Sequence, residues 1–161
     1  LDTVRERGHL VCANNGTLPG FGFVDENGDF SGFDWEYCRA VAAAALGDAD
    51  AVEGRPTTAT ERFPVLQSGE ADVLIRNTTW TISRDTSLGF DFAPVTFYDG
   101  QGMMVRIDSG ITELEDMEGG SVCVQAGTTT EKNLADLFRL FNISAESVVP
   151  PHNRRTTAPY H

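Results

Sequence analysis

The stretch RNTTWTISRD, residues 76–85, follows a short apolar run at residues 73–75 and indicates most about the fold. It collects hydroxyl groups, turn backbone N–H groups and the guanidinium of Arg84 on one short connection. A guanidinium presents a planar fork of N–H donors that matches a carboxylate with two hydrogen bonds at a time. Hydroxyls and backbone N–H groups at a helix start supply further donors to an anion. The stretch is therefore typical of a carboxylate-binding loop, and also of an ordinary strand–turn–helix capped by Thr81 or Ser83.

Two other segments of the chain complete this pattern. Upstream, residues 10–23 pass from an apolar strand pattern through several glycines into a hairpin with Asn27-Gly28 at its turn, and then into an apolar helix. Downstream, residues 122–131 lead from an apolar run into another helix. In their order and motifs the three segments resemble the periplasmic solute-binding proteins of amino-acid ABC transporters. The likeness is strongest to the branch that binds L-amino acids broadly, and it covers residues 1–149.

The composition agrees with that class and excludes others. The chain has 161 residues, of which 40% are hydrophobic, so it can bury a core. Its 24 acidic and 12 basic residues give a net charge of −12. This charge argues against nucleic acid and anionic membrane surfaces as partners, because both attract basic patches. No apolar run is long enough to insert across a membrane, and no signal peptide is visible. A periplasmic location is therefore implied by the resemblance alone.

The three cysteines are Cys12, Cys38 and Cys123, and they form neither a CxxC pair nor a spacing typical of a metal site. Cys12 lies in the first predicted strand, and Cys38 lies on the helix expected to pack beside it. The sequence leaves open whether these two form a disulfide or stay as free buried thiols. The resemblance implies that the partner of Cys123 lies further along the chain than this sequence reaches. No metal and no other cofactor is predicted.

Alternating strand and helix patterns predict an α/β fold with a parallel sheet covered on both faces. Strand patterns occur at residues 9–13, 21–32 (as a hairpin), 51–54, 71–75 and 121–125, and helical patterns at residues 35–46, 60–68 and 129–141. The resemblance implies a periplasmic-binding-protein-like fold of type II, an open sheet with lobe one nearly complete and lobe two truncated. The expected boundaries are lobe one at 1–99, a hinge crossover strand at 100–105, a partial lobe two at 106–149 and an irregular tail at 150–161.

Two features of the second half of the chain lead to further expectations. The glycine-containing run at residues 97–105 fits either a bulged edge strand or a hinge between lobes, and we favour the hinge. If lobe two is truncated, the apolar face of the helix at 129–141 lacks part of the sheet that it should cover. Exposed apolar faces and unpaired strand edges favour association. We therefore expect a homo-oligomer, and domain swapping is one way in which it could form.

The resemblance also implies a ligand site on lobe one. Members of the family hold the α-carboxylate of the amino acid through an arginine and a hydroxyl, which correspond here to Arg84 and Thr79. Asn77 occupies the position at which members of the family contact the α-ammonium group of the amino acid. Arg76 and Asn14 lie near the expected pocket for the ligand side chain, where an arginine suits acidic or amide groups.

Lobe two is expected to add a helix N-terminus that caps the carboxylate. Thr128 and Thr129 match this position, and Gln125 lies nearby. The spacing from Thr128 to Glu131 is also that of an ordinary capping box. The family's acidic partner of the α-ammonium group would lie beyond the end of this chain, so we expect weakened or lost binding.

Three functions follow as hypotheses. The first is capture of L-amino acids for uptake by an ABC transporter, with the transporter permease as partner. The second is a non-binding truncated lobe that persists as a homo-oligomer. The third is a dehydratase-type enzyme on the same fold. The sequence disfavours an enzyme, because it places no histidine in the site and contains no GxSxG, HExxH or Cys/His pattern.

Overall fold

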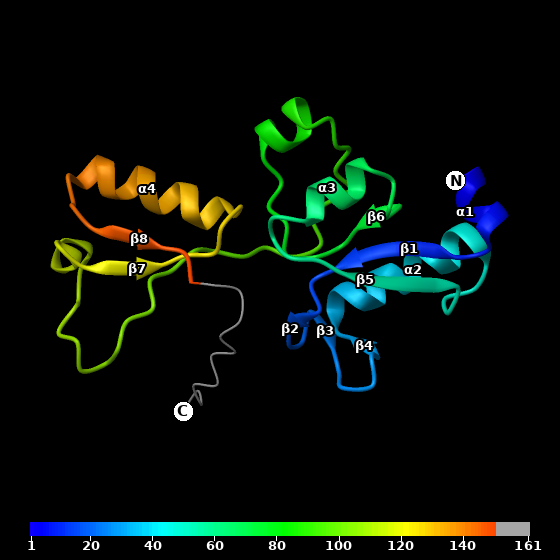
Figure 1. The fold of residues 1–161 in the computed structure, drawn as a ribbon, viewed down its shortest axis with the longest axis horizontal. Coiled ribbons are helices and arrows are strands. Elements are labelled where there is room, and N and C mark those ends of the chain that lie inside the picture. The colour runs from blue at the N-terminus through cyan, green and yellow to red at the C-terminus, as the bar shows by residue number, and fades with distance from the viewer. Residues whose placement is uncertain (151–161) are drawn as a thin grey trace. The chain divides into compact units, whose positions relative to one another are not determined.

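The computed structural model describes residues 1–150 (Figure 1). The described residues divide into two compact units, the first at Leu1–Phe92 and the second beginning at Ala93, and each unit is described by itself. The predicted lobe boundaries at residues 99 and 105 stay predictions. The predicted tail lies outside the described residues except for Pro150.

A three-stranded parallel sheet forms the centre of the first unit (Figure 1). Its strands are β1 (Leu10–Asn14), β5 (Val52–Pro56) and β6 (Val73–Leu74), in the spatial order β5-β1-β6. Helix α2 (Phe33–Leu46) lies between β1 and β5 in the chain, and α3 (Arg62–Gln67) lies between β5 and β6. Parallel neighbours require such crossovers. The predicted α/β alternation is confirmed.

Strand β1 shows how both faces of this sheet are covered. Successive side chains of a strand point to opposite faces. Leu10 and Cys12 accordingly pack in one apolar cluster with residues of α2, whereas Ala13 packs in another cluster with Val65 of α3. Val11 joins the second cluster from the same face as Ala13. This arrangement explains why β1 is apolar at nearly every position.

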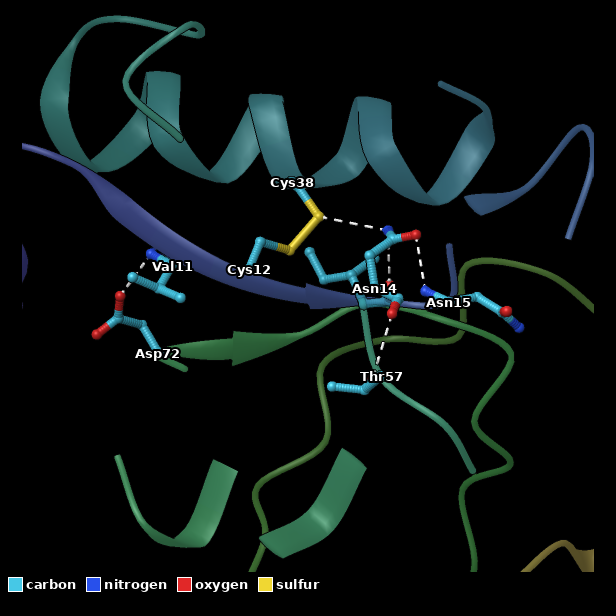
Figure 2. The surroundings of a disulfide bond; sticks show 8 residues. Val11, Cys12, Asn14, Asn15, Cys38, Thr57 and Asp72 are labelled. Carbon is cyan, nitrogen blue, oxygen red and sulfur yellow. Dashed lines mark hydrogen bonds between the residues drawn. A yellow bond between two sulfur atoms is a disulfide. The ribbon is translucent and has the colours of Figure 1, made fainter. Parts of the chain in front are cut away.

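A disulfide joins β1 to α2 (Figure 2). The sulfur atoms of Cys12 and Cys38 are bonded, and the two Cα atoms are 6.0 Å apart. Both residues are fully buried in the cluster beneath α2. Of the two alternatives that the sequence left open, the bridge is the one formed. Cys123 is free and exposed.

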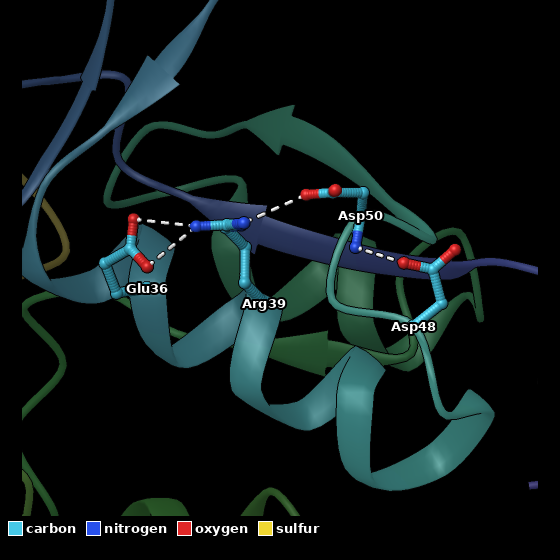
Figure 3. Close-up of polar contacts among 4 residues, drawn as sticks. All are labelled: Glu36, Arg39, Asp48 and Asp50. Carbon is cyan, nitrogen blue, oxygen red and sulfur yellow. Dashed lines mark hydrogen bonds and ion pairs between the residues drawn. The ribbon is translucent and has the colours of Figure 1, made fainter.

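Polar contacts fasten the exposed side of α2 to the loop that precedes β5 (Figure 3). Arg39 donates to Glu36 Oε2 at 3.0 Å and to Asp50 Oδ1 at 2.9 Å. The backbone N–H of Asp50 donates in turn to Asp48 Oδ1 at 2.9 Å. Exposed ion pairs of this kind contribute little to stability, because water screens the charges. These contacts hold the loop before β5 in place, and they do not form part of the apolar core.

The rest of the first unit is built from short elements around the sheet. An antiparallel β2-β3-β4 sheet contains the predicted hairpin, with Asn27-Gly28 in its turn, and Asp25 Oδ1 accepts from the backbone N–H of Asn27 at 2.8 Å. The prediction of this hairpin is confirmed. The bounds of these elements are α1 (Asp2–Arg7), β2 (Thr17–Leu18), β3 (Gly22–Val24), β4 (Phe30–Ser31) and η1 (Ser83–Ser87).

The second unit has a short parallel sheet and one longer helix (Figure 1). Strands β7 (Ser121–Cys123) and β8 (Glu146–Val148) pair in parallel, and α4 (Thr129–Phe141) lies between them in the chain. A 3₁₀ turn, η2 (Leu114–Met117), precedes β7. Within α4, Leu134 and Phe138 are buried in the apolar cluster of this unit, as their helical spacing predicted.

The predicted crossover strand at residues 100–105 is not formed. Residues 97–105 belong to neither a helix nor a strand. A strand is held by hydrogen bonds to a neighbouring strand, and no segment of residues 1–150 pairs with this one. Its two glycines further lower the preference for strand. None of the helices formed by residues 1–150 has the length and apolar character needed to cross a membrane.

Candidate functional site

The candidate site lies where the three parallel strands of the first unit end. Strand β1 ends at Asn14, β5 is followed by Thr57, and β6 is followed closely by residues 76–79. In open parallel sheets, ligands bind beyond the carboxyl ends of the strands, where the chain connections diverge to opposite sides. Because β5 and β6 flank β1 on opposite sides, this position lies beside β1.

Arg76 extends along this edge of the sheet and is 8% exposed. Its Nη1 donates to the carbonyl of Thr57 at 2.6 Å, and its Nε and Nη2 donate to Asn77 Oδ1 at 3.2 and 3.1 Å. Burial lowers the pKa of Arg76 to about 10, and the nearby carboxylate of Asp34 acts in the opposite direction. The guanidinium therefore remains charged at neutral pH and is held by neutral acceptors.

Asn77 is exposed, and its oxygens are used within the protein. Its side-chain Oδ1 accepts from Arg76 and also from Asn15 Nδ2, at 2.9 Å, and its backbone carbonyl accepts from Arg62 Nη1 at 3.0 Å. The structure thus gives Asn77 the role of holding two arginines. Its contact with the α-ammonium group of a ligand stays a prediction.

Arg62 was missed in the sequence, where α3 was interpreted only as a short apolar helix. It is 2% exposed, and its Nη1 also donates to Thr78 Oγ1 at 3.2 Å. Its Cζ lies 4.8 Å from the centre of the Phe63 ring. Burial, reinforced by the charges of Arg76 and Arg84, lowers the pKa of Arg62 to about 9. The signal in the sequence was an arginine beside Phe63 in an otherwise apolar helix.

Arg84 is the second residue of the π-helical turn η1 and is 8% exposed. Its Nη1 donates to the carbonyl of Thr79 at 2.7 Å, and its Cζ lies 5.0 Å from the centre of the Phe63 ring. Burial lowers the pKa of this guanidinium. Its backbone N–H donates to Thr81 Oγ1 at 3.3 Å, but the N-cap of η1 is Ile82, without a side-chain cap, so the predicted capping by Thr81 or Ser83 is not formed. The predicted pair of Arg84 and Thr79 is therefore brought together.

Asn14 is predicted to lie near the pocket for the ligand side chain, and this role stays a prediction. It is fully buried, and Figure 2 shows its hydrogen bonds at the end of β1. Its Nδ2 donates to the carbonyl of Ile75 at 3.0 Å and lies 3.7 Å from Cys38 Sγ, while its Oδ1 accepts from the backbone N–H of Asn15 at 2.8 Å. Its carbonyl accepts from the backbone N–H of Thr57 at 2.8 Å. These bonds tie the ends of the strands together.

Asp34 is the second residue that the sequence did not single out as part of the site. It stands in the first turn of α2 and is 5% exposed. Its Oδ2 is buried and has no hydrogen-bond partner among residues 1–150. Burial raises the pKa of its carboxyl group, and the charge of Arg76 opposes this rise. Asp34 is thus a buried carboxyl group near Arg76 with one oxygen still able to accept a hydrogen bond.

The other predicted site residues, Gln125, Thr128 and Thr129, lie in the second unit at the start of α4. Thr128 is the N-cap: its Oγ1 accepts from the backbone N–H of Glu131 at 3.1 Å and donates to the carbonyl of Gln125 at 2.7 Å. Glu131 Oε2 accepts from the backbone N–H of Gly127 at 2.9 Å. The capping interpretation of Thr128 is confirmed, and its hydroxyl is already engaged.

The chemistry available at the strand ends is that of an anion site. Three buried guanidiniums, those of Arg62, Arg76 and Arg84, lie close enough to influence one another, with Asp34 as a single buried carboxyl group. Guanidiniums bind carboxylates with paired hydrogen bonds. Across residues 1–150, no group of His, Cys, Asp and Glu side chains is arranged to hold a metal ion.

Comparisons with known proteins point to one family. Residues 10–156 match the profile of the bacterial extracellular solute-binding proteins, family 3. The chain is 52% identical over 149 residues to the general L-amino acid-binding periplasmic protein AapJ of Rhizobium johnstonii, covering 92% of this chain and 44% of that protein. It is 51% identical over 144 residues to the glutamate/glutamine/aspartate/asparagine-binding protein BztA of Rhodobacter capsulatus, covering 89% and 43%.

Solved structures give the same result. A periplasmic binding protein of an ABC transporter from Brucella ovis, with glutathione bound, is 53% identical with a TM-score of 0.86, covering 92% of this chain and 47% of that chain. The ancestral amino acid-binding protein AncCDT-1, a precursor of cyclohexadienyl dehydratase, is 30% identical with a TM-score of 0.74, covering 92% and 64%. The chain spans less than half the length of the two curated relatives.

Proposed function

The chain belongs to the bacterial extracellular solute-binding proteins of family 3, and on this premise we propose that it binds an L-amino acid for uptake by an ABC transporter. Its fold is the α/β fold of type II periplasmic binding proteins, of which the chain covers a part. The two curated relatives are named as binding proteins and not as enzymes. The proposal includes a periplasmic location and a transporter permease as partner.

The observation that carries this proposal is the set of buried arginines at the carboxyl ends of β1 and β6. Arg84 is held by the carbonyl of Thr79 and by the Phe63 ring, which fixes its direction before a ligand arrives. We assign the α-carboxylate of the amino acid to Arg84, with Thr79 as a second donor. Fixing the guanidinium in advance lowers the entropy lost on binding. Gln125, Thr128 and Thr129 stay predicted contributors from the start of α4.

Isothermal titration of the ligand-stripped 161-residue chain with pooled L-amino acids tests the proposal. The variant Arg84→Gln removes the charge that we assign to the carboxylate, and Arg55→Gln is a matched control on the same unit, because Arg55 pairs with Glu70 on the surface. Saturable heat in the wild type and in the control, absent from Arg84→Gln, supports the proposal. No heat from a folded wild type contradicts it.

A second candidate is self-association through the second unit, as a homo-oligomer with or without domain swapping. Its described part leaves large apolar side chains exposed, including Met104 at 85%, Leu140 at 74% and Phe141 at 48%. Among residues 1–150, its parallel sheet has only two strands. Parallel sheets normally have more strands and are covered by other elements on both faces, so a second chain could supply what this unit lacks. Light scattering on the purified chain separates the candidates, because a monomer at micromolar concentration contradicts self-association and leaves amino-acid binding unaffected.

A further inference from the structure

The buried charges at the carboxyl ends of β1 and β6 do not balance. The buried charged residues within 1–150 are Arg62, Arg76, Arg84 and Asp34, so positive charge exceeds negative charge by two. Burying a charge without an opposite charge is costly. The whole chain carries −12, so this concentration of positive charge runs against its overall character. An imbalance of this kind at the end of a parallel sheet indicates a ligand that brings negative charge.

Arg76 and Arg84 each keep 8% of their surface exposed, whereas Arg62 keeps 2%, so Arg76 is an arginine that a ligand can still reach. Its three hydrogen bonds go to the carbonyl of Thr57 and the amide oxygen of Asn77, both of which are neutral. Asp34 lies near enough for its charge to act on Arg76, yet no hydrogen bond or ion pair joins these two residues. A guanidinium has more N–H donors than these three bonds use. Arg76 is therefore oriented by the protein and still able to donate to an anion.

The charges of candidate ligands differ in how well they match this site. A neutral amino acid brings one carboxylate and one ammonium group, so it leaves the excess positive charge unchanged. An amino acid with an acidic side chain brings a second carboxylate and reduces the excess. If Arg84 takes the α-carboxylate, Arg76 is the more exposed of the two buried arginines left for the second one. Asp34 Oδ2 is buried and has no partner in the described part of the chain. Its negative charge would repel a second anion placed beside it, so a second carboxylate is favoured next to the arginines.

We propose that this site selects amino acids whose side chain ends in a carboxylate, and that Arg76 is the residue that recognises this second carboxylate. The proposal rests on the proposed function, because it assumes that an amino acid binds at Arg84. It assigns the two arginines different tasks: Arg84 binds a group that every amino acid has, and Arg76 binds a group that distinguishes one class.

Titration of the full 161-residue chain with L-glutamate, L-glutamine and L-alanine tests this division. Glutamate and glutamine have the same length and differ only in the terminal group, so their affinity ratio measures recognition of the second carboxylate. We expect the wild type to bind glutamate about tenfold or more tightly than glutamine, as one charge-assisted contact can supply. In Arg76→Gln the ratio should fall to about one, mainly through loss of glutamate affinity. Arg55→Gln, with the same loss of charge at the surface, should keep the wild-type ratio.

Several results would overturn the proposal. Equal affinity of the wild type for glutamate and glutamine contradicts it without reference to any variant, so it can be tested even if Arg76→Gln fails to fold. An equal loss of all three ligands in a folded Arg76→Gln would show a merely structural role for Arg76. Failure of every amino acid to bind the wild type overturns the proposed function itself, which is a different result from binding without selectivity.

Discussion

Breaking the disulfide between Cys12 and Cys38 should destabilise the first unit strongly. The bridge joins residues 26 positions apart, and this loop contains the β2-β3-β4 hairpins and the first part of α2. A cross-link stabilises the fold by limiting the unfolded chain, and a loop of 26 residues corresponds to about 3.5 kcal/mol in the chain-entropy model. Small proteins are stable by only about 5–15 kcal/mol in total. Reduction should therefore remove a large part of the stability of this unit.

Urea unfolding with and without a reducing agent measures this effect. Reduction keeps both sulfur atoms in the buried cluster, so it isolates the cross-link better than substitution by alanine does. With a denaturant slope of about 1.5 kcal/mol/M, the unfolding midpoint should fall by about 2 M urea. The background for the experiment is Cys123→Ala, which removes the exposed free thiol and with it thiol exchange. This variant should itself unfold at the wild-type midpoint.

Two results would refute this reasoning. If all three thiols of the unfolded, unreduced wild type react with a thiol reagent, the bridge is absent. If the bridge is present and reduction moves the midpoint by less than about 0.3 M, the loop adds little constraint to the unfolded chain.

Three further predictions concern single positions. Gly22→Ala should lower the melting temperature by several degrees, because a Cβ at this position would overlap Asn14 Oδ1, whereas Gly100→Ala, with open space around it, should not. Thr128→Ala removes the N-cap of α4 and should cost about 1 kcal/mol, measured by urea unfolding followed by far-UV circular dichroism. Burial raises the pKa of Asp34 above 3.8, so the folded state favours its protonated form. The free energy of unfolding should therefore decrease as the pH rises from about 4 through the raised pKa, and Asp34→Asn should lack this component in the same urea titrations.

Elements with strong local signals could be predicted from the sequence. The apolar run of β1, the Asn27-Gly28 turn and the capping spacing from Thr128 to Glu131 each depend on neighbouring residues, and each is formed. The strand predicted at 100–105 failed because a strand also needs a partner, which a local pattern does not reveal.

Only those residues of the candidate site that lie together in one segment of the chain could be predicted from the sequence. Arg76 and Arg84 stand in one stretch of chain, and their residue types indicated an anion site. Arg62 and Asp34 reach the same strand ends from α3 and α2, so their place depends on how these helices pack against the sheet. The burial of Asn14 could not be predicted either, because its partners Ile75 and Thr57 are distant in sequence.

The central claim is that the carboxyl ends of β1 and β6 bind the carboxylate of an amino acid through Arg84. A crystal structure of the 161-residue chain with bound L-glutamate tests it most directly. We expect the α-carboxylate to lie within about 3 Å of the Arg84 guanidinium, paired by two hydrogen bonds. Glutamate bound elsewhere, or bound at the strand ends with Arg84 contacting no part of it, would contradict the account.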